Sequence, residues 1–178
     1  MKIYTFELSP KLLYQTQTVP NPQGLCHICQ DSANPIIAFP GRQIGRVTIV
    51  SLPQSTATSG ALTPSPLHIN AHQNTLVALT MSADGELLAT ASERGTLVRV
   101  FDTKSGARLY ELRRGTIAAL ITCITFDHST AADGKRRLAV ASDHGTVHIF
   151  IIKSSANEGD CTTSGSRNSP SLDQQNAS

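Results

Sequence analysis

The sequence predicts an all-β fold built from repeated four-stranded antiparallel sheets, the arrangement of a β-propeller. The first observation is an internal repeat, because the glycines Gly45, Gly95 and Gly145 are spaced by fifty residues and each precedes an alternating apolar segment. The second is that apolar residues alternate with period two and show no helical period of 3.6 residues. Several short strands per repeat of this length are typical of propeller blades, which bury their open faces against one another.

The second and third copies of the repeat are similar over a longer stretch, since Leu88–Arg94 corresponds to Leu138–His144. In the second copy, Asp-Gly and Arg-Gly pairs separate short apolar runs and supply the positive φ that tight hairpins need. We therefore predict a four-stranded meander with strands at residues 75–81, 86–92, 96–102 and 108–113.

The same reasoning divides the rest of the chain. We expect a partial propeller over residues 1–152, in which residues 1–6 form the last strand of a preceding blade and residues 53–66, rich in Ser, Thr and Pro, form a connector. The predicted blades span approximately residues 21–52, 67–113 and 114–152. Residues 153–178 are polar and should form a disordered tail. Since propellers usually have four to eight blades, about three blades predict a fragment of a larger propeller.

Composition excludes several classes of function. The formal net charge of the 178-residue chain is +2 and aromatic residues make up only 4%, which argues against a nucleic-acid interface. No apolar run approaches the roughly 20 residues that span a bilayer, and no signal peptide is recognisable, so we expect a cytoplasmic protein. No motif of a hydrolase, metalloprotease or nucleotide-binding loop occurs, so we predict neither an enzyme nor a cofactor.

Cysteine spacing offers one candidate metal or redox site. Cys26 and Cys29 have the separation of a zinc half-site, but Cys123 and Cys161 stand alone and cannot supply a matching second pair. We therefore expect half-buried strand cysteines and no metal.

Two adjacent arginines stand at the end of the last predicted strand of the second copy, Arg113 as its final residue and Arg114 directly after it. Neighbouring side chains in a strand point to opposite faces, so the pair would serve two pockets, one on each side. The charged, planar guanidinium suits phosphate oxygens. A solvated charged turn is the alternative explanation.

Several motifs together resemble a known family. Ala71-His72 and Phe101-Asp102 stand where WD repeats usually have Gly-His and Trp-Asp. The segments that carry the closer match are Leu88–Phe101, Leu112–Thr116, Ser142–Phe150, Asn21–Cys26 and Phe39–Gly41. Over residues 1–153 the chain resembles the PROPPIN family of seven-bladed WD-repeat propellers, and Leu112 in place of the usual phenylalanine resembles its WDR-forty-five-type branch.

The resemblance implies two sites for phosphoinositide headgroups beside the arginine pair. Site one would use His72, Thr90, Ser92, Gly95, Thr96, Arg99 and Arg113. Site two would use Arg114, Thr116, Ser142, Thr146 and His148. The assignment of each arginine to its site is implied by the family alone. As alternatives, His72 and Ser92 could belong to a structural hydrogen-bond network of a WD blade, and Arg99 and His148 could project from a solvated face.

The function that the resemblance implies is a scaffold that binds phosphatidylinositol 3-phosphate and the 3,5-bisphosphate on membranes. Such a protein would be cytoplasmic and peripheral on phagophore, pre-autophagosomal or endosomal membranes, with autophagy proteins as partners. A generic WD-repeat scaffold for protein interactions without lipid binding is the alternative. We expect the family's membrane-inserting loop, which lies in a later blade, to be absent, and we assign no role to the insertion at residues 131–135.

Overall fold

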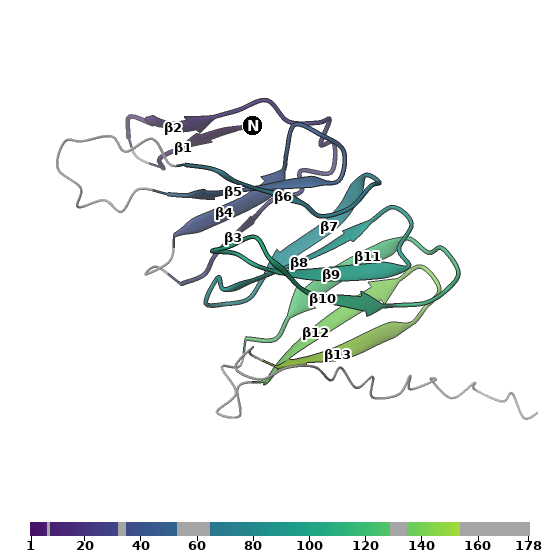
Figure 1. Cartoon of the computed structure of the whole chain (residues 1–178). Coiled ribbons are helices and arrows are strands. Elements are labelled where there is room, and N and C mark those ends of the chain that lie inside the picture. Colours follow the sequence, from purple (N-terminus) through teal and green to yellow (C-terminus); the bar gives the residue numbers. More distant parts are fainter. Residues whose placement is uncertain (7, 32–34, 53–64, 129–134, 154–178) are drawn as a thin grey trace, which may run out of the picture.

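The computed structural model describes residues 1–6, 8–31, 35–52, 65–128 and 135–153, and every regular element in these ranges is a β-strand. The strands form four antiparallel sheets that follow one another along the chain (Figure 1). The first two sheets contain β1 (Lys2–Tyr4) and β2 (Leu12–Gln15), then β3 (His27–Ile28), β4 (Ile36–Pro40), β5 (Arg46–Ser51) and β6 (Leu67–Asn70). The last two contain β7 (Leu76–Met81), β8 (Leu87–Ser92), β9 (Leu97–Asp102) and β10 (Arg108–Arg113), then β11 (Ile121–Phe126), β12 (Lys135–Ser142) and β13 (Val147–Lys153).

The β7–β10 sheet confirms the predicted meander, because its four strands lie within one residue of the predicted ranges at every end. Each strand pairs with the next one in the sequence, as hairpin connections require. The predicted all-β fold class is therefore confirmed.

Two predicted boundaries differ from the structure, and one strand pairing has no counterpart in the prediction. Strand β6 pairs with β5, with Ile69 opposite Val47, so residues 67–70 complete the β3–β6 sheet and the next sheet begins at Leu76. A Ser/Thr/Pro-rich connector marks a loop but does not reveal which strands it joins. Strand β1 pairs with β2, which the sequence did not suggest. Lys153, predicted to open the polar tail, ends β13; residues 53–64, 131–134 and 154–178 lie outside the described residues.

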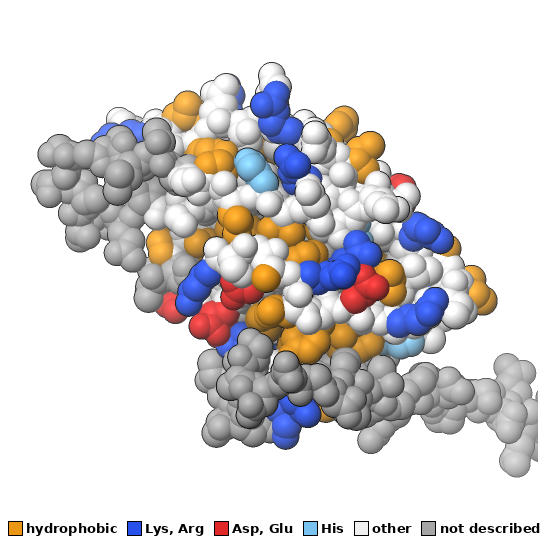
Figure 2. All heavy atoms as spheres, in the orientation of Figure 1, with side chains coloured by type: hydrophobic (Ala, Val, Ile, Leu, Met, Phe, Trp, Pro, Cys, Tyr) orange, Lys and Arg blue, Asp and Glu red, His pale blue; other side chains and the backbone are white. Residues whose placement is uncertain are grey.

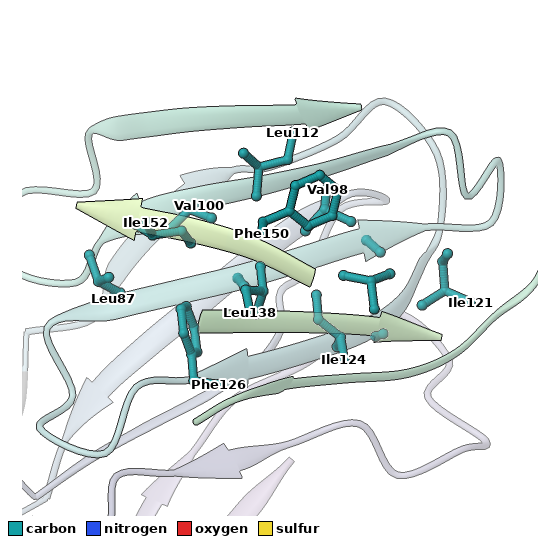
Figure 3. Packing of buried hydrophobic residues seen from close by; sticks show 14 residues of the cluster. Leu87, Val98, Val100, Leu112, Ile121, Ile124, Phe126, Leu138, Phe150 and Ile152 are labelled. Carbon is teal, nitrogen blue, oxygen red and sulfur yellow. The ribbon is translucent and has the colours of Figure 1, made fainter. Parts of the chain in front are cut away.

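Apolar side chains from neighbouring sheets form two buried clusters. One joins the β3–β6 sheet to the β7–β10 sheet and includes Phe101, and the other joins the β7–β10 and β11–β13 sheets. In the second cluster Val98 and Leu112 face Leu138 and Phe150 (Figure 3). Because alternate residues of β9 enter different clusters, the β7–β10 sheet is buried on both faces.

The repeated glycine has a packing role in two of its three copies. Gly45 and Gly95 have φ of 72° and 60°, and a Cβ there would lie 1.9 Å from the His72 carbonyl oxygen and 1.7 Å from the Ala119 carbonyl oxygen. Both carbonyls belong to the segment that enters the following sheet. Gly145 also has a positive φ, of 67°, but no atom of the described residues lies within 4 Å of a Cβ there. The first two glycines therefore allow a turn to pack against the next sheet.

Candidate anion-binding sites

The two adjacent arginines lie in different environments. Arg113 is the last residue of β10 and is exposed, and its side chain makes no hydrogen bond or ion pair with the residues that the structure describes. Arg114 is only 8% exposed. Its Nε donates a hydrogen bond to the Gly95 carbonyl oxygen at 2.7 Å, and its second guanidinium nitrogen donates to the Ile117 carbonyl oxygen. Arg113 is thus available to a ligand, whereas Arg114 is committed to the backbone.

A polar row crosses the face of the β7–β10 sheet that is turned toward the β3–β6 sheet. Thr90 lies opposite Arg99, and Arg99 lies opposite Glu111, so the three side chains share one face. Arg113 lies two residues beyond Glu111 along β10 and therefore points to the same face. This arrangement brings Thr90, Arg99 and Arg113 of predicted site one to the same side of one sheet.

His72 adds a neutral hydrogen-bonding group to this row. Its Nε2 lies 3.0 Å from the Thr90 hydroxyl oxygen. Burial, together with the nearby positive charge of Arg99, lowers the pKa of His72 to about 4, so the ring is neutral at pH 7. A structural network at His72 is therefore present, but the partner of His72 among the described residues is Thr90 and not Ser92.

Arg99 is held in place by two acceptors. Its Nε donates to Glu111 Oε2 at 2.8 Å, and one of its terminal nitrogens donates to the Ala71 carbonyl oxygen at 2.7 Å. The side chain is 22% exposed. Arg99 therefore does not project from a solvated face, because the neighbouring sheet covers much of that face.

The residues of predicted site two lie on the β11–β13 sheet and on the segment after β10. The Ser142 hydroxyl lies 3.3 Å from the Thr146 hydroxyl across the β12–β13 turn. His148 lies opposite Val140 and is stacked with Phe150 at a ring-centroid distance of 6.3 Å, so it also faces the preceding sheet and not solvent. Thr116 is exposed.

The guanidinium of Arg114 donates no hydrogen bond to Ser142 or Thr146. Its guanidinium donates back to the Gly95 carbonyl oxygen, and its backbone N–H donates to the Thr96 carbonyl oxygen at 2.9 Å. The β8–β9 turn, which follows Ser92 and contains Gly95 and Thr96, is therefore tied to the segment that leads into predicted site two.

Sequence reasoning missed Glu111. This carboxylate accepts hydrogen bonds from Arg99 at 2.8 Å and from Arg108 at 3.0 Å, and its side chain is 40% exposed. The sequence held no signal for it, because a β-bulge between Arg108 and Tyr110 shifts the register and so places Glu111 opposite Arg99.

The Cys26–Cys29 segment makes contacts between sheets. Cys29 is buried and its Sγ donates to the Ala83 carbonyl oxygen at 3.5 Å, while His27 Nδ1 accepts the Met81 N–H at 2.8 Å. Burial raises the pKa of Cys29 and lowers that of His27. In the part of the chain that the structure describes, no group of three His, Cys, Asp or Glu side chains could hold a metal ion. Cys161 lies outside that part.

On the face shown in Figure 2, Lys and Arg side chains lie in separate groups, some beside Asp and Glu, and not in one continuous stripe. A largely apolar cavity of about 450 Å³ lies between the segment of residues 19–25, the β4–β5 turn and β7, and none of the predicted site residues lines it. No helix in the described ranges is long and apolar enough to cross a membrane.

Successive antiparallel sheets packed face to face, with a glycine turn repeated in each copy, define a β-propeller protein. The chain belongs to the PROPPIN family, whose model matches residues 2–169, and the predicted family is thereby confirmed.

Curated relatives and solved structures agree with this membership. The chain is 42% identical over 152 residues to SVP1-like protein 2 of Neurospora crassa, which covers 85% of this chain and 31% of the relative. It is 36% identical over 155 residues to Ectopic P granules protein 6 of Caenorhabditis elegans, and the match covers 86% of this chain and 38% of the relative. It is 32% identical over 185 aligned positions to Autophagy-related protein 18 of Aspergillus terreus, and the match covers 93% of this chain and 43% of the relative.

Among solved structures, Kluyveromyces lactis Hsv2 superposes with a TM-score of 0.70 at 25% identity over 87% of this chain and 44% of that one. The chain thus spans between 31% and 44% of the length of these relatives.

Proposed function

We propose that this chain binds phosphoinositide headgroups through the polar row beside Arg113 and through the Ser142–Thr146–His148 group, and so acts as a non-catalytic membrane-recruited scaffold. The observation that carries the proposal is the state of Arg113. This exposed guanidinium has no partner among the described residues, and it shares a sheet face with Arg99 and Thr90. Arginines with free donors next to hydroxyl groups are suited to phosphate oxygens.

Our assignment of site one is Arg113 and Arg99 as charged donors, with Thr90, Ser92, Thr96 and His72 as neutral hydrogen-bonding groups. Gly95 would shape the β8–β9 turn beside the site, since its own backbone packs against the Ala119 carbonyl oxygen. His72 would contribute as a neutral ring, since its pKa is about 4 in the free protein.

Our assignment of site two is Ser142, Thr146 and His148, with Thr116 from the facing segment. Arg114 would contribute in two ways. It holds the β8–β9 turn through the Gly95 carbonyl oxygen, and a bound phosphate could recruit its guanidinium from the Ile117 carbonyl oxygen. Two weak sites on one chain gain affinity on a membrane through effective concentration.

We further propose phosphatidylinositol 3-phosphate and the 3,5-bisphosphate as the lipids, and a role in autophagosome formation on phagophore or endosomal membranes with autophagy proteins as partners. The name of one relative, Autophagy-related protein 18, supports this assignment, as does membership of the PROPPIN family.

The test is flotation of the purified chain with liposomes that contain phosphatidylinositol 3-phosphate and with liposomes that contain none. Arg113→Ala should reduce flotation about tenfold or more, because it removes a charged donor without disturbing a contact of the fold. Arg137→Ala is the matched control, since this arginine is 66% exposed and lies on β12. Flotation that depends on lipid but is equal in wild type and Arg113→Ala would refute the assignment of site one.

A generic WD-repeat scaffold for protein interactions is favoured by one observation. Arg114, half of the arginine pair, is bound to backbone carbonyl oxygens as a structural residue would be. Under this alternative the folded, monodisperse chain would not float with any phosphoinositide, and the arginines would contact acidic proteins instead.

A further inference from the structure

Glu111 is the one carboxylate in the described polar row that contains Arg99 and Arg113. Its Oε2 accepts hydrogen bonds from Arg99 Nε at 2.8 Å and from Arg108 at 3.0 Å. With 40% of its side chain exposed, Glu111 lies where a ligand that reaches Arg99 would also meet it. A phosphate and this carboxylate would therefore compete for the same guanidinium.

Arg99 has a second anchor besides Glu111. A terminal nitrogen of Arg99 donates to the Ala71 carbonyl oxygen at 2.7 Å, and this bond ties the guanidinium to the segment between β6 and β7. Removal of the negative charge at Glu111 would leave that anchor intact. The Ala71 carbonyl oxygen would therefore still hold the Arg99 guanidinium after the charge at Glu111 is removed.

From this geometry we infer that Glu111 is a specificity-determining residue of site one, an inference that rests on the proposed function. The Glu111 carboxylate weakens the binding of headgroups with several phosphates more than it weakens the binding of headgroups with one. A phosphomonoester carries between one and two negative charges at pH 7, so each additional phosphate increases its repulsion from a carboxylate in the same row. The first phosphate gains Arg99 and Arg113, whereas a second phosphate adds repulsion from Glu111.

The test substitutes Glu111→Gln, which keeps an acceptor for Arg99 Nε and removes the charge. Affinity is measured by flotation with vesicles of phosphatidylcholine containing phosphatidylinositol 3-phosphate, the 3,5-bisphosphate, or phosphatidylserine at matched surface charge. We expect Glu111→Gln to bind the bisphosphate about three- to tenfold more tightly and the monophosphate about two- to threefold more tightly, the range for one screened charge.

Asp127→Asn is the matched control, because it changes the net charge equally but lies in the β11–β12 connection of another sheet. Its binding should follow wild type within about twofold, and a gain equal to that of Glu111→Gln would show a non-specific charge effect and overturn the inference. Unchanged or weaker bisphosphate binding by Glu111→Gln, with wild type still binding, would also overturn it and would identify Glu111 as a positioning residue. If wild type binds no phosphoinositide, the proposed function itself fails, which is a distinguishable result.

Discussion

Replacing each arginine of the adjacent pair separately should affect stability very differently. Arg114→Ala removes a guanidinium that is 8% exposed and that donates to the carbonyl oxygens of Gly95 and Ile117. Arg113→Ala removes an exposed side chain without hydrogen bonds to the described residues. The first change should destabilise the fold and the second should not.

The magnitude follows from the contacts. A hydrogen bond from a charged group contributes about 1.5–3 kcal/mol, and two such bonds are lost in Arg114→Ala. Part of this loss is offset, because removing the guanidinium also removes the cost of burying its charge. We expect a net loss of about 2–3 kcal/mol in the free energy of unfolding. Arg113→Ala should change it by no more than about 0.5 kcal/mol.

Urea unfolding at pH 7, followed by circular dichroism, measures both values. With a denaturant dependence of about 2 kcal/mol/M for a chain of this size, the midpoint of Arg114→Ala should fall by about 1–1.5 M. Equal midpoints for the two variants would contradict the burial of Arg114. If the prediction holds, a double alanine variant cannot separate lost binding from lost structure, so vesicle experiments should begin with Arg113→Ala.

Three further predictions concern the polar row, the repeated glycine and the contact between sheets. The pKa of His72 is lowered to about 4 in the folded chain, so as pH falls below about 6.5 the ring takes up a proton in the unfolded chain before it does so in the folded one. The free energy of unfolding should therefore decrease by up to about 3 kcal/mol between pH 6.5 and 4. Urea unfolding should show this decrease in wild type and a smaller one in His72→Gln. Gly95→Ala should lower the free energy of unfolding by about 3 kcal/mol or more, since the new Cβ would lie 1.7 Å from a backbone oxygen. Gly145→Ala should cost only about 1–2 kcal/mol, because only the positive φ opposes it. Equal decreases in the thermal unfolding midpoint of the two variants would contradict this difference. Arg136→Ala should cost about 2 kcal/mol of unfolding free energy, because this arginine is 16% exposed and pairs with two carboxylates of the β7–β8 turn. The control is Arg137→Ala, which removes a 66% exposed arginine and should cost less than about 0.5 kcal/mol in the same assay.

Local signals predicted the β7–β10 sheet well. Its hairpins are short, its turns contain Gly85, Gly95 and Gly106 at positive φ, and its apolar residues alternate, so each element could be recognised within one segment of sequence. The connection between β5 and β6 is longer and contains residues 53–64. A long connector carries no signal for the strand that follows it, and residues 67–70 were therefore assigned to the wrong sheet.

Register also limited what the sequence could reveal about the sites. Thr90 pairs with Arg99, nine residues later, but Val140 pairs with His148, only eight residues later. The β12–β13 hairpin is thus one residue shorter, and the structural counterpart of Arg99 is His148, although the fifty-residue spacing aligns it with Ile149. Since a shift of one residue reverses the face of every side chain, the repeat alone could not place His148 toward the neighbouring sheet.

Partners that come from another strand or segment were the least predictable features. Nothing in the neighbouring sequence indicates that Arg114 donates to the Gly95 carbonyl oxygen or that Glu111 lies against Arg99. These contacts depend on how sheets and turns pack, and they decide which arginine is free to bind.

The most direct test of two headgroup sites is an NMR titration of the ¹⁵N-labelled chain with a short-chain, water-soluble phosphatidylinositol 3-phosphate. We expect amide shifts in two separate groups, one at residues 90–99 and one at residues 142–148, with Arg113→Ala abolishing the first group and leaving the second. Shifts in neither group, in a chain whose spectrum shows a folded protein, would contradict the account. Loss of both groups in Arg113→Ala, with the fold retained, would contradict the existence of two independent sites.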